Sequence, residues 1–189
     1  MLDADYIAAT LRWVDEIVIH HNFCPFARHA RYPGGIYCHV SHGDTGDILA
    51  ALFDECQRLD NNPAIATTLM ILVSPDTATF DSYLDVLAIG EKMLSDWGYA
   101  GTYQLASFHP DYQFEGEAED SVANYTNRSP FPLLHLIRES DIAKYMKNED
   151  DAEKIYRHNI EQANALGCPY FSAKLQALKT PQCERPLQE

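Results

Sequence analysis

The residues best suited to chemistry lie in a polar segment between positions 107 and 132 of this 189-residue chain. His109 and Asp111 flank a proline that stiffens their separation, and a histidine beside a carboxylate can transfer protons. Long loops dense in ionisable, amide and aromatic residues are more often functional than ordinary short connections. We therefore expect His109 and Asp111 to be catalytic and Tyr112 to line the substrate pocket. The alternative role for Tyr112 is to anchor the loop to the core.

The residues that follow are suited to an anion. Ser129 before Pro130 is typical of a helix start, where free N–H groups and a partial positive charge favour anions. A helix from there would place His135 and Arg138 on one face. Alternatively, Arg128 pairs with one of the many acidic side chains and His135 is a satisfied interior histidine. The expected ligands of a phosphate or carboxylate are Asn127, Arg128, Ser129, His135 and Arg138.

Alternatively, His109 and Asp111 bind a divalent metal ion. It would need a third ligand, such as His135, Glu115 or Glu117. The sequence contains no established metal-binding spacing such as His-Glu-x-x-His, and no glycine-rich phosphate loop, dinucleotide motif or Gly-x-Ser-x-Gly. We therefore expect no cofactor.

Cys24 is the candidate nucleophile, and its reactivity depends on which helix it belongs to. At the C-terminal end of the first helix the helix dipole would disfavour the thiolate. If Pro25 begins a short second helix, Cys24 is its N-cap residue and the thiolate is favoured. A buried, inert thiol is the common state of a free cysteine.

Composition limits the partners. The chain has 14 Lys+Arg against 28 Asp+Glu and a net charge of -14, which disfavours nucleic acid and anionic membrane surfaces. No stretch approaches the roughly 18 to 20 apolar residues that span a bilayer, and the acidic N-terminus does not resemble an export signal. Five cysteines without a CxxC motif fit reduced thiols. We expect a cytoplasmic protein with a small anionic partner, and the sequence does not give its oligomeric state.

Hydrophobic periodicity predicts an α/β or α+β fold, with βαβ units and C-terminal helices around a small three-stranded or larger mixed sheet. Residues 1–170 should form one globular domain, and 171–189 a weakly ordered tail that contains two prolines. The expected helices are 4–20, 47–59, 80–97, 130–147 and 150–166, and the expected strands are 36–40, 67–73 and 102–108.

Polar residues directly follow each expected strand, at 42–44, 74–76 and 109–111. If the strands are parallel, these three segments lie along one edge of the sheet, where open α/β sheets bind their ligands. The alternative is that Asp44 and Asp76 cap the next helices.

Three blocks, at 22–27, 106–114 and 124–136, resemble the hallmark sequences of a bacterial family, domain of unknown function 1415. The resemblance covers roughly residues 5–167. It implies no activity, substrate or catalytic residue, and His20-His21 depart from the family's pattern.

Two functional hypotheses follow. In the first, the protein is a small enzyme that acts on a small anionic metabolite. In the second, it is a non-catalytic ligand-binding or interaction module, whose polar loop 107–132 forms either a binding surface or a structural network.

Overall fold

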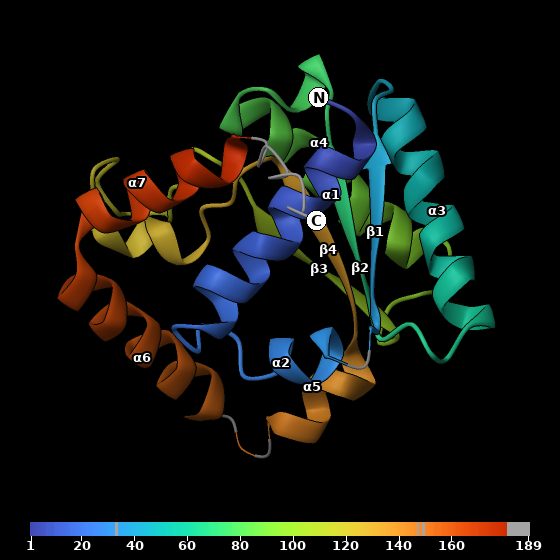
Figure 1. Cartoon of the computed structure of the whole chain (residues 1–189). Helices are drawn as coiled ribbons and strands as arrows, with labels where there is room; N and C mark the ends of the chain where they lie inside the picture. The colour runs from blue at the N-terminus through green and yellow to red at the C-terminus, as the bar shows by residue number, and fades with distance from the viewer. Residues whose placement is uncertain (33, 147, 149, 181–189) are drawn as a thin grey trace, which may run out of the picture.

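A four-stranded mixed sheet lies at the centre of the molecule, with helices on both faces (Figure 1). This computed structural model describes residues 1–32, 34–146, 148 and 150–180. The strands lie in the order β1-β2-β4-β3 and have the bounds Ile36–Ser41 (β1), Thr67–Leu72 (β2), Tyr103–Phe108 (β3) and Leu133–Arg138 (β4). β1, β2 and β3 run in one direction, and β4 runs antiparallel between β2 and β3. The predicted mixed α/β fold is confirmed.

Two long helices cover one face of the sheet. These are α3 (Thr45–Asn61) and α4 (Phe80–Asp96), both predicted from periodicity. Their apolar sides form a core with alternate residues of the central strands, which include Met70, Leu134 and Leu136. Because successive strand residues point to opposite faces, the residues between these belong to a different core.

The other face is covered by the N-terminal helix and by α7. The predicted helix 4–20 is confirmed, but it has two parts: the α-helix α1 (Asp3–Trp13) and a π-helix, η1 (Val14–Ile19). A short helix, α2 (Ala27–Arg31), follows. The core on this face contains residues of the N-terminal helix, of α7, of the segment before α2 and of the sheet: Trp13, Ile17, Phe23, Leu69, Ile71, Leu133 and Phe171.

The predicted helix 130–147 is wrong. Residues Leu133–Arg138 form β4, and only a short helix, α5 (Glu139–Tyr145), follows. β4 bonds to a strand on each side and is covered on both faces. The sequence of a strand buried in this way is a nearly continuous apolar run, without alternation of polar residues. A run of this kind cannot be distinguished from a buried helix by periodicity alone.

The three polar segments after the parallel strands do share one edge of the sheet, as predicted. Asp44 caps α3, because its carboxylate accepts the Asp47 N–H at 3.1 Å. Asp76 lies in a 3-10 turn, η2 (Pro75–Thr77), and accepts both the N–H and the hydroxyl of Thr45 at 2.9 Å. It therefore bonds to the first turn of α3, and Thr79 caps the following helix instead.

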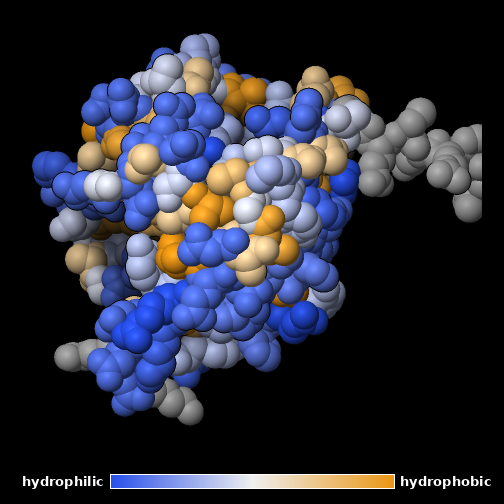
Figure 2. All heavy atoms as spheres, turned by 90° about the vertical axis from the view of Figure 1, so that its left-hand side faces the viewer, coloured by the Kyte–Doolittle hydropathy of each residue, from blue (hydrophilic) through white to orange (hydrophobic). Residues whose placement is uncertain are grey.

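The last two helices close the described part of the fold. α6 (Asp150–Leu166) matches its prediction and ends at Gly167, whose φ of 77° suits glycine. α6 buries only Ala163, and the molecular face that contains α6 and α7 is largely hydrophilic, with hydrophobic side chains gathered near its centre (Figure 2). Of the described helices, none has the length and apolarity needed to cross a membrane.

The prediction of a weakly ordered tail from residue 171 is wrong up to Lys179. Residues Cys168–Lys179 form α7, which buries Phe171, Leu175 and Leu178. The two prolines of the predicted tail lie outside the described residues.

Phe171→Ala tests this placement of α7. Phe171 is fully buried and stacks on Tyr125 at 5.4 Å between ring centres. Removing a buried phenylalanine side chain leaves a cavity and should lower the free energy of unfolding by about 3 to 5 kcal/mol. Urea unfolding measures this change, with Gln176→Ala on the exposed side of the same helix as the control. Equal stabilities of the two variants would contradict the packing of α7.

Candidate functional site

His109 is a structural residue of the polar loop. Its side chain is 1% exposed. Nδ1 accepts the backbone N–H of Asp111 at 3.0 Å, so Nε2 carries the proton and donates it to the carbonyl of Thr77 at 3.2 Å. Burial also lowers the pKa of His109. Both ring nitrogens are therefore engaged, and the group of Asp111 that contacts the ring is its backbone rather than its carboxylate.

The Arg128 guanidinium also bonds within the loop. Nε donates to the carbonyl of Tyr112 at 3.2 Å and Nη2 to that of Glu119 at 2.9 Å, while the guanidinium lies 4.6 Å from the centre of the Tyr125 ring. Within the described ranges Arg128 makes no ion pair with a carboxylate. The Tyr112 ring packs on Phe80 at 5.0 Å, so this ring anchors the loop.

The predicted anion site at a helix N-terminus is wrong, because no helix begins at Ser129. The Ser129 hydroxyl instead donates to the carbonyl of Phe131 at 2.6 Å. Asn127 donates from Nδ2 to the carbonyl of Ser107 at 3.2 Å, which joins the loop to the end of β3.

His135 and Arg138 do not share a face, because both belong to β4 and residues three apart in a strand point to opposite sides. Arg138 lies on the α3 side, where it donates to the carbonyl of Leu59 and to the hydroxyl of Tyr103. His135 lies on the α1 side, where it lines a cavity.

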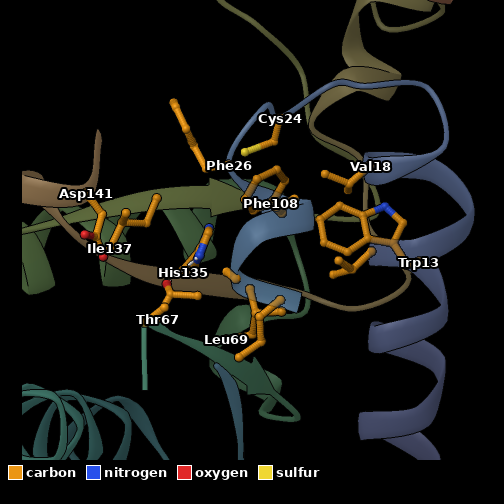
Figure 3. A pocket seen from close by; sticks show the side chains of 15 residues that line it. Trp13, Val18, Cys24, Phe26, Thr67, Leu69, Phe108, His135, Ile137 and Asp141 are labelled. Carbon is orange, nitrogen blue, oxygen red and sulfur yellow. Dashed lines mark hydrogen bonds between the residues drawn. The ribbon is translucent and has the colours of Figure 1, made fainter. Parts of the chain in front are cut away.

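This cavity has a volume of about 90 Å³ and is almost entirely apolar (Figure 3). It lies between the sheet, the junction of α1 with η1, and α2. Ile36 and Thr67, the first residues of β1 and β2, help to line it. The cavity is therefore near the opposite edge of the sheet from the three polar segments. The further lining residues include Trp13, Val14, Val18, Cys24, Phe26, Leu69, Phe108, Ile137 and Asp141.

The edge where the sequence predicts a ligand carries a more open groove of about 410 Å³. Ser74, Pro75 and His109 contribute to it, together with Phe131 and Pro132. Its walls are mainly apolar. Of its two ionisable lining residues, Tyr6 and His109, the histidine already has both ring nitrogens bonded.

Thr67 fixes the protonation state of His135. The Thr67 hydroxyl lies 2.7 Å from His135 Nε2 and donates its own proton to the carbonyl of Leu136 at 2.6 Å. Since a hydroxyl has a single proton, Nε2 must donate to Thr67. His135 Nδ1 then presents a lone pair, and no atom of the described residues bonds to it. Figure 3 shows the Thr67 side chain directly beside the ring.

Burial lowers the pKa of His135 to about 4. Loss of hydration is the cause, because an imidazolium in apolar surroundings has neither water nor a carboxylate to stabilise it. At neutral pH the ring is therefore an uncharged hydrogen-bond acceptor in an apolar wall.

Cys24 lies in the same cavity, near Phe26 and Phe108 (Figure 3). α2 begins only at Ala27, so Cys24 precedes that helix by three residues and belongs to neither of the two predicted positions. Burial raises the pKa of its thiol, and the backbone N–H groups of Phe26 and Ala27 oppose this rise more weakly. The thiol is protonated at neutral pH, which is unfavourable for a nucleophile.

The π-helix is a feature that sequence reasoning missed. Val14 and Val18 of η1 line the cavity, and Trp13, at the junction with α1, lines it as well. π-helical turns are rare and occur frequently at functional sites. Helical periodicity does not reveal this one, because η1 has only six residues, too few to show a change of period.

Among the described residues, no three histidine, cysteine, aspartate or glutamate side chains lie close enough together to hold a metal ion. The proposed third ligand, His135, is in the cavity, whereas the ring of His109 is bonded to Thr77 and to the Asp111 backbone. The metal alternative therefore has no geometric support in this part of the chain.

The comparisons with known proteins identify a family but no activity. The model of the family described as "Protein of unknown function (DUF1415)" matches residues 5–173. No curated protein and no solved structure matches the chain.

The lowered pKa of His135 predicts a specific pH dependence of stability. Between the folded pKa of about 4 and the ordinary histidine pKa of about 6.5, the unfolded chain binds more protons than the folded protein. Stability should therefore fall as the pH drops through this window, by up to about 1.4 kcal/mol per pH unit from this group.

Urea unfolding at several pH values measures this slope. His135→Leu should show a shallower slope than wild type, and His42→Leu, at an exposed histidine that pairs with Asp3, controls for the loss of a histidine. His21 and His109 also have lowered pKa values, and they contribute equally to all three proteins. Equal slopes in wild type and His135→Leu would show that His135 titrates normally.

Proposed function

The chain belongs to this family of unknown function, and we propose from its site that it is a ligand-binding protein whose cavity takes a small, neutral, mainly apolar molecule. The observation that carries the proposal is the lone pair of His135 Nδ1 in the apolar cavity. A ligand in the cavity that donates a hydrogen bond to this nitrogen gains both polar and apolar contacts.

The cavity limits the size and charge of the ligand. An apolar cavity of about 150 Å³ holds the six-atom ring of benzene. The 90 Å³ of this cavity is smaller, so the ligand can be no larger than a ring of about five heavy atoms. The carboxylate of Asp141, which is paired with Lys144, lies among the lining residues, and no lysine or arginine does. These features favour a neutral ring with one N–H or O–H donor over an anion.

The contacts between α2 and α5 support the idea that the cavity can open. Tyr145 of α5 contacts the rings of Phe26 and His29 in the α2 segment, at 5.0 and 5.5 Å between ring centres. α2 and α5 lie side by side at the lower end of the sheet in Figure 1, and neither contains a buried residue. Short helices with few buried contacts open at low cost, which gives a ligand a path into the cavity.

Binding without catalysis is favoured over an enzyme that acts on an anionic metabolite. A general base works best when its pKa is close to the working pH, and the pKa of His135 is about 4. Cys24 is protonated, and His109 donates and accepts within the protein. His135, Cys24 and His109 therefore lack the state that covalent or acid–base chemistry requires.

Pyrrole and furan test this proposal, because the two rings have nearly the same shape and only pyrrole has an N–H donor. Wild type should bind pyrrole more tightly than furan. In His135→Leu the ratio of the pyrrole affinity to the furan affinity should fall roughly tenfold, because the pyrrole N–H then enters the cavity without an acceptor. The reporter is the indole N–H resonance of Trp13, which lines the cavity, with Trp97 on the opposite side of the sheet as the internal reference.

His42→Leu provides the matched control, since it makes the same replacement at an exposed position and should keep the wild-type preference. The proposal fails if neither ring shifts the Trp13 resonance in wild type. It also fails if His135→Leu discriminates between the two rings as wild type does.

A further inference from the structure

A second hollow lies between the polar loop and α7, outside the cavity of His135. It is a groove of about 230 Å³. Arg128 contributes from the loop and Lys179 from the last turn of α7. The other polar residues that line it are Asp111, Tyr125, Ser129, Ser172 and Gln176.

Arg128 is held rigidly at this groove. Two of its five N–H donors bond to carbonyl oxygens, and the plane of the guanidinium is further held by the Tyr125 ring. Carbonyl oxygens orient an arginine without neutralising its charge. Because the Arg128 side chain is already ordered, it loses little conformational entropy when a ligand binds.

Among the described residues, both cations of the groove lack an acidic partner, as do Arg28 and Arg138. Acidic residues outnumber basic ones by 28 to 14, and most of the described lysines and arginines pair with a carboxylate. Arg128 and Lys179 make no such pair with any described residue, although both line the same groove. Asp111, at the edge of the groove, is exposed and forms no ion pair with either within the described ranges.

The groove also offers neutral hydrogen-bond donors. The hydroxyls of Tyr125 and Ser172 lie 2.6 Å apart, so one of them donates to the other and the second proton remains available. The amide of Gln176 is a further donor on the same side of α7. Two cations with adjacent neutral donors are the arrangement that recognises an oxyanion.

We propose that Arg128 and Lys179 form an anion site, which binds a phosphate or carboxylate group in the groove between the loop and α7. The partner of Arg128 is thus the last turn of α7 rather than a helix start at Ser129. This anion site does not depend on the cavity of His135. The two adjoin, because the Trp13 indole N–H donates to the Arg128 carbonyl at 3.1 Å.

Titration of the full chain with inorganic phosphate at low ionic strength tests the site. The Nε–H resonance of Arg128 is the reporter, because its bond to Tyr112 should make it observable. Wild type should show saturable shifts at millimolar phosphate. Lys179→Gln should weaken the apparent affinity by about threefold, the range expected of one exposed charge pair.

Lys92→Gln makes the same replacement on α4, at the far side of the sheet, and controls for the change in net charge. Its affinity should equal that of wild type, and Asp111→Asn should bind phosphate about twofold more tightly because a nearby negative charge is removed. These substitutions are at exposed positions, so folding should be retained. The proposal is overturned if phosphate causes no saturable shift in wild type, or if Lys179→Gln and Lys92→Gln bind it equally.

Discussion

The position of β4, antiparallel between two parallel strands, is the constraint on which the rest of the structure depends. It gives β4 a bonded neighbour on each side, and Leu133, Leu134 and Leu136 enter the two cores. His135 lies between these residues in apolar surroundings, and the loss of hydration there lowers its pKa to about 4. The apolar cavity and its single basic nitrogen therefore follow from the sheet order.

The polar loop connects two strands that are neighbours in the sheet. β3 and β4 are neighbours that run in opposite directions, yet the chain makes a long excursion at 109–132 before it returns. A segment of this length must satisfy its own backbone. Asn124 is fully buried and binds the backbone of Phe114, Ala118 and Glu119, while Arg128 binds that of Tyr112. Several polar side chains of this segment thus bond to its own backbone.

Local sequence patterns predicted most of the fold. The positions of the candidate site residues depended instead on the pairing of β2 with β4, which are distant in sequence. The capped helices α3 and α4, the helical N-terminus and the parallel strands follow from periodicity and from residues such as Asp44. β4 could not be recognised, because its apolar run fits a buried helix equally well, and this one error misplaced Ser129, His135 and Arg138. Among the predicted site residues, Cys24 and His135 do meet in one cavity. Their partner Thr67 has no signal in the sequence, since its role arises only from the pairing of β2 with β4.

The most direct test of the central claim is the nitrogen NMR spectrum of the His135 ring at neutral pH, with and without pyrrole. The structure predicts a neutral ring protonated at Nε2, with an unprotonated Nδ1 whose resonance moves on addition of pyrrole while Nε2 changes little. A ring protonated at Nδ1 or at both nitrogens would contradict the account, as would an Nδ1 resonance that pyrrole leaves unchanged.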